Sequence, residues 1–221
     1  MIRNIIIFGI GDFAELVYYY FKNCSDYNVV AFTVNKLYIN TEKYLGVPIV
    51  AFEDIEKKYP VEENDMFIAI GYSKVNKIRR DKFLEAKQKG YNLASFISSN
   101  AIVAENATIG ANSFILEGVI IQPFVCIGDA VILWSGCHVG HHSTVNNYCF
   151  LAPSTSLSGY VTINELSFIG NGAIIRDSVI VGKENVIGAG VVILNNTNDK
   201  SVYKSSEGSL LGITSDQLRS I

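Results

Sequence analysis

The first 97 residues alternate short apolar runs, which favour strands, with longer runs of helical periodicity. The strands expected here cover residues 4–8, 28–34, 65–70 and 93–97, and the helices cover residues 13–21 and 76–90. Gly9-Ile10-Gly11 ends the first strand, and Gly90 closes the second helix. Strands that alternate with helices form a parallel sheet with helical crossovers. We therefore expect a Rossmann-like α/β domain at residues 1–97.

From residue 98 to residue 193 the apolar positions follow a period of six. Every sixth residue from Val103 to Ile193 is Ile, Val or Leu, at sixteen positions. The residue four places further on is usually small or β-branched, as in Ala107 and Ser113. Six residues suffice for one short strand and a corner, so three units close a triangular coil of 18 residues. Stacked coils form the hexapeptide-repeat β-helix, left-handed in the known families, and we expect about five of them.

The repeat ends near residue 193. The cluster from Asn195 to Asp199 is typical of turns. We expect residues 194–221 to form an irregular C-terminal tail with a short helix at 214–219.

Composition and charge narrow the function classes. The chain is 49% hydrophobic and 18% charged with a net charge of −3, which fits a folded protein and provides no basic surface for nucleic acid. The uncharged run at residues 4–11 is too short to span a membrane. The four cysteines form no CxxC pair, so we expect free thiols and a cytoplasmic protein.

The three histidines of the chain, His138, His141 and His142, lie within five residues. His138 precedes an inward aliphatic residue and should point outward, whereas His141 lies at a corner. The same corner carries Gly159 one coil further on and Asp177 two coils further on. Imidazole suits proton transfer near neutral pH, and the N–H of Gly159 suits a developing oxyanion. The alternatives are a polar surface cluster and a simple tight corner.

Three motifs and the hexad array carry a resemblance to a known family. The motifs are Gly-Ile-Gly-Asp-Phe-Ala at 9–14, Phe-Ile-Ala-Ile-Gly-Tyr at 67–72 with Arg79, and Val-Gly-His-His-Ser at 139–143. Over roughly residues 3–193 the chain resembles the sialic acid O-acetyltransferase family of sugar acyltransferases. That family includes N-acetyltransferases of nucleotide-linked 4-amino-4,6-dideoxy sugars.

The resemblance implies a homotrimer that binds acetyl-CoA between adjacent β-helices. It implies that His141 is the general base, that the N–H of Gly159 faces the thioester carbonyl, and that Gly188-Ala189-Gly190 contacts CoA. The N-terminal domain would hold a nucleotide-linked sugar, and no metal is expected. The candidate catalytic residues are His141, His142 and Gly159, and the candidate substrate-binding residues are Gly9, Gly11, Asp12, Phe13, Thr33, Asn35, Lys36, Gly71, Tyr72, Arg79, Trp134 and His138.

The chain departs from the family pattern at four places. His142 stands where an acidic residue usually follows the base, and Phe150 stands where the family has a second histidine. Thr33-Val34 replaces an acidic pair after the second strand, and Ser205–Gly212 replaces a C-terminal Gly-x-Pro-Ala signature. The acid that would orient His141 must therefore come from elsewhere or be missing.

The leading hypothesis is direct transfer of an acetyl group from acetyl-CoA to a sugar amine in glycan biosynthesis. His141 would take the amine proton, and His142 or His138 would tune or orient it. An acyl-cysteine route is disfavoured because Cys137 and Cys149 occupy inward corner positions, where thiols are usually inert. A sugar hydroxyl is the alternative acceptor, which the sequence does not distinguish from an amine.

Alternatives from other classes fit parts of the pattern. Three histidines suggest a zinc enzyme like γ-class carbonic anhydrase, although their spacing does not match that family. Gly9-x-Gly11-x-x-Ala14 loosely matches a dinucleotide fingerprint, but no acidic residue ends the second strand. We expect a nucleotide-sugar phosphate at this turn instead, with Lys36 and Arg79 as helpers. A non-catalytic binding scaffold is the remaining alternative.

Outward apolar residues point to a partner surface. Trp134 follows the inward Leu133, so it should face outward near the histidines, either in the acceptor pocket or in an interface. Together with Ile120 and Phe124 it favours contact with another subunit.

Overall fold

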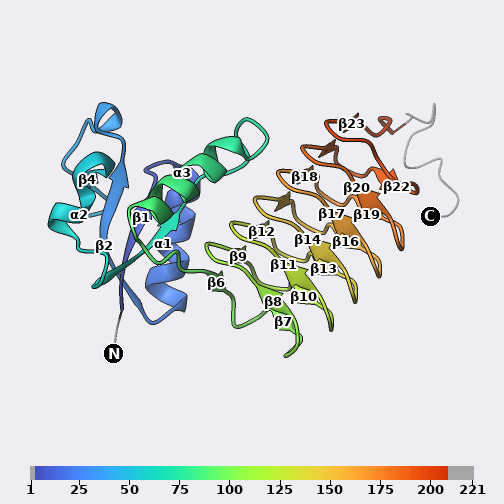
Figure 1. The fold of residues 1–221 in the computed structure, drawn as a ribbon, viewed down its shortest axis with the longest axis horizontal. Coiled ribbons are helices and arrows are strands. Elements are labelled where there is room, and N and C mark those ends of the chain that lie inside the picture. The colour runs from blue at the N-terminus through green and yellow to red at the C-terminus, as the bar shows by residue number, and fades with distance from the viewer. Residues whose placement is uncertain (1–2, 209–221) are drawn as a thin grey trace, which may run out of the picture.

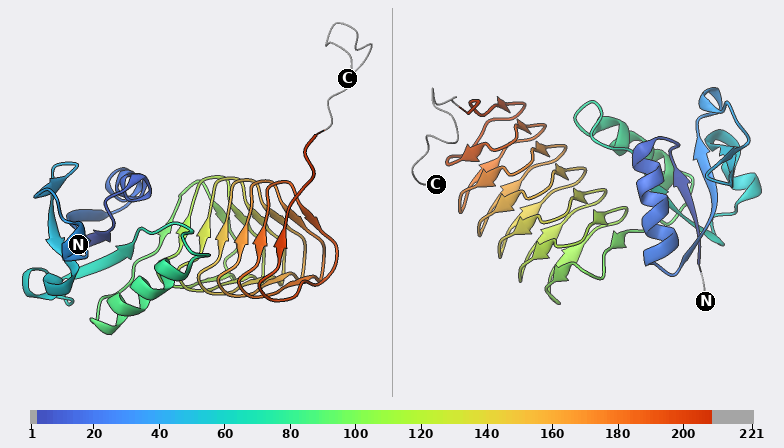
Figure 2. Two further views of the ribbon diagram at one scale, coloured as in Figure 1. Left: turned by 90° about the horizontal axis from the view of Figure 1, so that it is seen from above. Right: turned by 180° about the vertical axis from the view of Figure 1, so that it is seen from behind.

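The computed structural model describes residues 3–208, which form an α/β domain joined to a triangular stack of short strands (Figure 1). The α/β domain lies beside the first coils of the stack, and the chain leaves the stack at the far end (Figure 2). The helix expected at 214–219 lies outside the described residues. No helix among residues 3–208 combines the length and apolar character needed to cross a bilayer.

The N-terminal sheet has the strand order β3-β4-β2-β1-β5. Its strands are β1 (Arg3–Phe8), β2 (Tyr27–Val34), β3 (Lys43–Tyr44), β4 (Val47–Ala51) and β5 (Asn64–Ile68), all parallel except β3. The helices are α1 (Asp12–Cys24), α2 (Ile55–Lys58) and α3 (Lys77–Gln88), with 3-10 turns at Lys36–Tyr38 and Phe52–Asp54. Ile5 and Ile7 pack with α1 on one face of the sheet, and Ile6 and Phe8 pack with α3 on the other. The predicted Rossmann-like layers are confirmed.

A left-handed parallel β-helix of two-residue strands follows, with three flat faces. The first face holds β7 (Ile102–Val103), β10 (Ile120–Ile121), β13 (His138–Val139), β16 (Ser156–Leu157), β19 (Ile174–Ile175) and β22 (Val192–Ile193). The second face holds β8 (Thr108–Ile109), β11 (Cys126–Ile127), β14 (Thr144–Val145), β17 (Thr162–Ile163) and β20 (Ile180–Val181). The third face holds β6 (Phe96–Ile97), β9 (Phe114–Ile115), β12 (Ile132–Leu133), β15 (Phe150–Leu151), β18 (Phe168–Ile169), β21 (Val186–Ile187) and β23 (Val202–Tyr203).

The inward column of the β-helix is the predicted one. Every sixth residue from Ile115 to Ile193 is at most 3% exposed, whereas Val103 and Ile109 at the first coil are partly buried. Pairing is in register over 18 residues, as when Val139 pairs with Leu157. Each coil therefore extends one continuous aliphatic core, and removal of this column from water is the main force that holds the coils together.

Three columns of corners join the faces. The histidine corner lies between the first and second faces and comprises residues 122–125, 140–143, 158–161 and 176–179. The asparagine corner lies between the second and third faces and comprises residues 128–131, 146–149, 164–167 and 182–185. The glycine corner lies between the third and first faces and comprises residues 116–119, 134–137, 152–155, 170–173 and 188–191.

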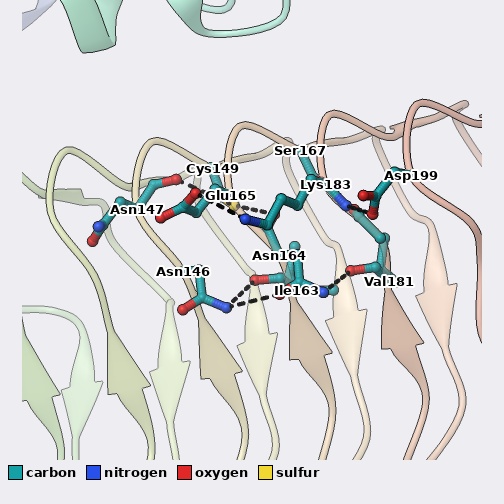
Figure 3. Close-up of polar contacts among 11 residues, drawn as sticks. Asn146, Asn147, Cys149, Ile163, Asn164, Glu165, Ser167, Val181, Lys183 and Asp199 are labelled. Carbon is teal, nitrogen blue, oxygen red and sulfur yellow. Dashed lines mark hydrogen bonds and ion pairs between the residues drawn. The ribbon is translucent and has the colours of Figure 1, made fainter.

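The last residue of a corner points inward and caps the next coil. Ser143, Ser167 and Cys149 each donate to a backbone carbonyl 15 residues further on, at 3.1, 2.9 and 3.2 Å. At the asparagine corner, Asn146 and Asn164 add a second ladder on the outside (Figure 3). Burial raises the pKa of the Cys137 and Cys149 thiols to about 12, so both are protonated and unreactive at neutral pH.

The strand predicted at 93–97 is divided between the two halves of the chain. Leu93 bridges β5 of the N-terminal sheet, whereas β6 pairs with β9 on the third face. The Phe96 ring explains the division, because it packs 5.4 Å from the ring of Phe114 in the β-helix. The prediction of one strand of the α/β sheet is therefore wrong for the second half of this segment.

An aromatic layer joins α1 to the third face. The rings of Phe13 and Tyr20 lie 5.7 and 5.6 Å from the ring of Phe114. The outward side chains Ile132 and Phe150 belong to the same buried cluster. The α1 helix thus lies between the N-terminal sheet and the β-helix.

Arg79 on α3 fastens the two halves together from inside. Its side chain is fully buried, and each of its five N–H donors meets a backbone carbonyl. The acceptors are Ile70, Gly71, Ala130, Tyr148 and Cys149, at 2.6–3.4 Å. Burial lowers the pKa of the guanidinium to about 9, so it stays cationic at neutral pH. The prediction that Arg79 helps to bind a phosphate is wrong, because no donor is left for one.

We expect Arg79→Met to lower the free energy of unfolding by about 3–5 kcal/mol, because buried carbonyls on both halves lose their donor. Urea unfolding followed by circular dichroism measures the change. Arg80→Met is the matched control, since Arg80 is partly exposed beside Asp81 and should lose less than about 1 kcal/mol. Equal losses in the two variants would show that the five-carbonyl site contributes nothing special.

Candidate active site

The histidine corner brings together the side chains that the 18-residue period placed in one column. Strands β13, β16 and β19 lead into it and position His141, Gly159 and Asp177 in three successive coils. His141 and Asp177 are exposed, whereas Gly159 between them is buried. The backbone N–H of His141 donates to Oε1 of Gln122 at 2.8 Å, which ties the corner to the preceding coil.

Gly159 is the floor of this site. A Cβ atom on it would lie 2.6 Å from Cε1 and 2.8 Å from Nε2 of His141, and 3.0 Å from Oδ1 of Asp177. The imidazole edge and the carboxylate therefore meet above its Cα. Its N–H has no acceptor among residues 3–208, although the next N–H, of Tyr160, donates to the carbonyl of His141 at 2.9 Å. An unpaired N–H beside an imidazole suits an oxyanion.

His142 contacts His141 directly. The two Nδ1 atoms lie 3.2 Å apart, and the rings are nearly perpendicular at 87°. The ring of His142 also lies between those of Phe124 and Tyr160. The stack was not predicted from the sequence, although Phe124, His142 and Tyr160 follow one another at intervals of 18 residues, the length of one coil.

His138 lies apart from the other two histidines. It points outward from β13, as predicted, and its Nδ1 lies 3.2 Å from the carbonyl oxygen of Leu157. Among residues 3–208, no three His, Cys, Asp or Glu side chains are grouped so that they could hold a metal ion. The zinc alternative therefore has no donor set within this part of the chain.

A second site lies at the glycine corner, on the other edge of the first face. A cavity of about 400 Å³ is lined by Tyr72, Trp134, Phe150, Ala152, Pro153, Phe168, Gly170, Asn171 and Ala189. Trp134 thus lies at this corner and not beside the histidines, because residues 134–137 join β12 on the third face to β13 on the first. Its ring lies 6.3 Å from that of Phe13 on α1. Gly188 and Gly190 flank Ala189 here. On one chain, the segment expected to contact CoA and the expected base are therefore at different corners.

A third site lies in the N-terminal domain, where parallel strands end. A cavity of about 310 Å³ is lined by Phe8, Val34, Asn35, Tyr38, Ile70, Ser73, Ile78 and Lys82. It lies at the carboxyl ends of the parallel strands β1, β2 and β5. Strands β2 and β5 lie on opposite sides of β1, and α/β folds bind ligands at such a switch in strand order. Gly9 directly follows Phe8 of the cavity lining and has a φ of +130°. A Cβ on Gly9 would lie 2.8 Å from the carbonyl oxygen of Ala69.

The predicted N-terminal residues divide into accessible and buried ones. Thr33 is fully buried and its hydroxyl donates to the Val50 carbonyl at 2.8 Å, so its predicted contact with substrate is wrong. Gly11 precedes α1, Asp12 begins it, and Lys36 is exposed beyond β2.

Glu53 supplies the acid that the second strand lacks. It follows β4, and its carboxylate accepts from Asn35 Nδ2 and from the backbone N–H of Lys36, both at 2.9 Å. The hydrogen bond from Asn35 lowers the pKa of Glu53 below its usual value. Sequence reasoning missed Glu53 because it examined only the end of the second strand.

Comparison with known proteins agrees with this architecture. The GMPPB C-terminal domain family matches residues 92–202, and the PglD N-terminal domain family matches residues 4–86. No curated protein matches the chain in sequence.

Solved structures resemble the chain over nearly its whole length. The acetyltransferase domain of PglB from Neisseria gonorrhoeae is 26% identical (TM-score 0.80, covering 90% of this chain and 95% of that one). A perosamine N-acetyltransferase mutant from Caulobacter crescentus, in complex with CoA and GDP-perosamine, is 27% identical (TM-score 0.82, covering 91% and 93%). WeeI from Acinetobacter baumannii, 22% identical with a TM-score of 0.75 and coverage of 90% and 95%, shares the fold.

Fold and comparisons define a hexapeptide-repeat acyltransferase. With half of its residues matched, the chain belongs to the family of the GMPPB C-terminal domain, and with its PglD-type N-terminal domain it is one of the sialic acid O-acetyltransferase-like sugar acyltransferases.

We expect Gly159→Ala to abolish most acyl transfer while leaving the fold intact. The new methyl group would displace the exposed imidazole of His141, which can swing outward at little cost in stability. The loss should approach the whole general-base contribution, about 10²–10⁴-fold in kcat. Ser158→Ala, at the preceding position of the same corner, is the control and should keep its activity. Full activity in Gly159→Ala would show that the reaction does not use this floor.

Proposed function

We propose that the protein transfers an acetyl group from acetyl-CoA to the amino group of a nucleotide-linked amino-deoxy sugar. The observation that carries the proposal is the convergence of His141 Nε2, the free N–H of Gly159 and the carboxylate of Asp177. The structural relatives crystallised with acetyl-CoA, or with CoA and GDP-perosamine, support the choice of donor and acceptor class.

The reaction follows from these three groups. The neutral acceptor amine attacks the thioester carbonyl carbon, and the carbonyl oxygen takes up negative charge against the Gly159 N–H. His141 Nε2 removes a proton from the attacking nitrogen. When the C–S bond breaks, the CoA sulfur leaves with the bonding electrons and takes that proton from the imidazolium. The products are the acetamido sugar and CoA, and no acyl-enzyme forms, which fits the buried, protonated thiols.

Asp177 favours an amine over a hydroxyl. Its Oδ1 and the imidazole edge of His141 both lie within 3.0 Å of the position a Cβ of Gly159 would take, so a sugar ammonium arriving there meets a negative charge. The ammonium releases one proton to water before the neutral amine attacks. A neutral hydroxyl gains no such attraction. O-acetylation is therefore the second candidate.

Binding of the nucleotide is assigned to the N-terminal cavity. We place the sugar nucleotide with its diphosphate near Gly9 and Gly11 at the start of α1. Glu53 lies beside Asn35 at the rim of this cavity and is a hydrogen-bond acceptor for the nucleoside. Residues 1–97 would thus be the acceptor domain, residues 98–193 the transfer domain, and residues 194–221 the tail.

A second copy would complete the site. The first face carries Ile102, Ile120, Ile174 and Val192 outward with 37–66% of their surface exposed, as two apolar pairs on either side of His138 and Ser156. Such a face is suited to contact with another subunit. A neighbour that sets its glycine corner against the histidine corner would bring Gly188-Ala189-Gly190 to His141, which supports a homotrimer. The free cysteines suit the cytoplasm, where nucleotide sugars and acetyl-CoA are made.

We expect the purified protein to release CoA from acetyl-CoA with at least one member of a panel of UDP-, dTDP- and GDP-linked amino sugars. His141→Asn should lower kcat about 10²–10⁴-fold because the base is lost. Lys183→Gln, at the asparagine corner, is the control. Silence of the wild-type protein across amino and hydroxy sugars would overturn the proposed function.

Asp177→Asn should raise KM for the amino sugar about twofold to fivefold, as expected for loss of an exposed ionic contact, while KM for acetyl-CoA stays unchanged. Steady-state kinetics with each substrate varied in turn measure the difference. Glu165→Gln makes the same chemical change at the asparagine corner and should leave both constants alone. Equal effects on the two substrates would place Asp177 outside the acceptor site.

A further inference from the structure

Three rings form a stack along the histidine corner, one from each of three successive coils. Phe124 and His142 have ring centroids 4.6 Å apart with planes inclined at 28°, and His142 and Tyr160 have centroids 4.8 Å apart at 14°. All three residues occupy the third corner position with φ between 57° and 65°. The shared backbone conformation sends the rings in one direction, so they lie face to face.

The stack fixes the plane of the His142 ring. With a ring on each face, the imidazole cannot rotate without losing contact on both sides. Its Nδ1 edge is thereby held toward His141, whose ring stands perpendicular to both His142 and Tyr160, at 87° and 88°. The Nδ1–Nδ1 distance of 3.2 Å is that of a hydrogen bond.

One hydrogen atom lies between the two nitrogens, so one ring donates and the other accepts. His141 turns Nε2 toward the point above Gly159, where an attacking amine must lose its proton. A base needs a free lone pair at that atom. The hydrogen of neutral His141 must then be on Nδ1, and Nδ1 of His142 must accept it.

We propose that His142 is the positioning residue of the active site: held in the Phe124–Tyr160 stack, it accepts a hydrogen bond from His141 Nδ1 and fixes the tautomer that frees Nε2. This inference rests on the proposed function and assigns to a neutral ring the role that an acidic side chain usually has. Because the acceptor is neutral, a proton on His142 Nδ1 removes the bond and adds repulsion. Among residues 3–208, the other ionisable groups beside the pair are Tyr160, which stacks on His142, and Asp177, which lies beside Gly159 with His141.

Two substitutions separate the hydrogen bond from the stack. His142→Phe keeps an aromatic ring between Phe124 and Tyr160 but removes the acceptor. His142→Glu removes the ring but restores an acceptor, now charged. The chain has only three histidines, so their ring nitrogens can be assigned in a long-range proton–nitrogen NMR spectrum of the full-length protein.

We expect the wild-type spectrum to show His141 as the Nδ1–H tautomer and His142 as the Nε2–H tautomer at a pH where both are neutral. His142→Phe should release His141 to a mixture in which Nε2–H predominates, whereas His142→Glu should keep Nδ1–H. This readout needs no turnover, so it tests the inference even if the acceptor sugar is not found. An unchanged His141 tautomer in His142→Phe would overturn the proposal.

Kinetics supply the second arm. His142→Phe should lower kcat about tenfold to a hundredfold, short of the loss of the base itself, with KM for acetyl-CoA unchanged. His142→Glu should recover part of kcat and move the acid limb of the pH profile to higher pH, because a neighbouring carboxylate stabilises the imidazolium of His141. If His142→Phe keeps kcat whereas His142→Glu loses it, His142 acts only through packing, which would overturn the proposal. A third variant, Phe124→Leu, tests the proposal if the His142 variants do not fold. It keeps His142 but loosens the stack, so it should give mixed His141 tautomers.

Discussion

Closing a triangular coil in 18 residues requires the chain to turn sharply at each corner, and the third residue of most corners meets this requirement with a positive φ. Glycines meet it at Gly136, Gly172 and Gly190, whereas the histidine corner uses Phe124, His142, Tyr160 and Ser178, at about 1–2 kcal/mol each. The same constraint aligns those side chains from coil to coil. The β-helix thereby builds a site from residues far apart in sequence without a loop to hold them.

What the period dictates could be predicted from the sequence. The inward aliphatic column and the order His141, Gly159 and Asp177 follow from counting in steps of 6 and 18 residues. Contacts between the halves have no period. Arg79 is one cation on a charged helix, and its partners are backbone carbonyls, which carry no mark in the sequence. Trp134 is outward as predicted but at the glycine corner, which the same period gives for the residue after Leu133 of β12. Only its packing against α1 lies beyond the period.

The nucleotide end shows the same limit. No acidic residue ends the second strand, and the sequence alone does not show which other strand end lies beside it. Glu53 reaches that place from the end of β4, a strand the hydrophobic pattern did not reveal because a proline interrupts it. Parallel strands gather their carboxyl ends at one edge, so a function left vacant by one strand can be filled by its neighbour.

The buried guanidinium of Arg79 has a consequence for substrate choice. Five carbonyls, two from the chain after β5 and three from the asparagine corner, accept from this one side chain and tie the N-terminal cavity to the β-helix. The distance between the two is then fixed. If the N-terminal cavity holds the nucleotide, as proposed above, the diphosphate and sugar ring must themselves span the distance to the histidine corner. On that proposal, sugars with the amine at another ring carbon would be rejected by length, without any contact that recognises them.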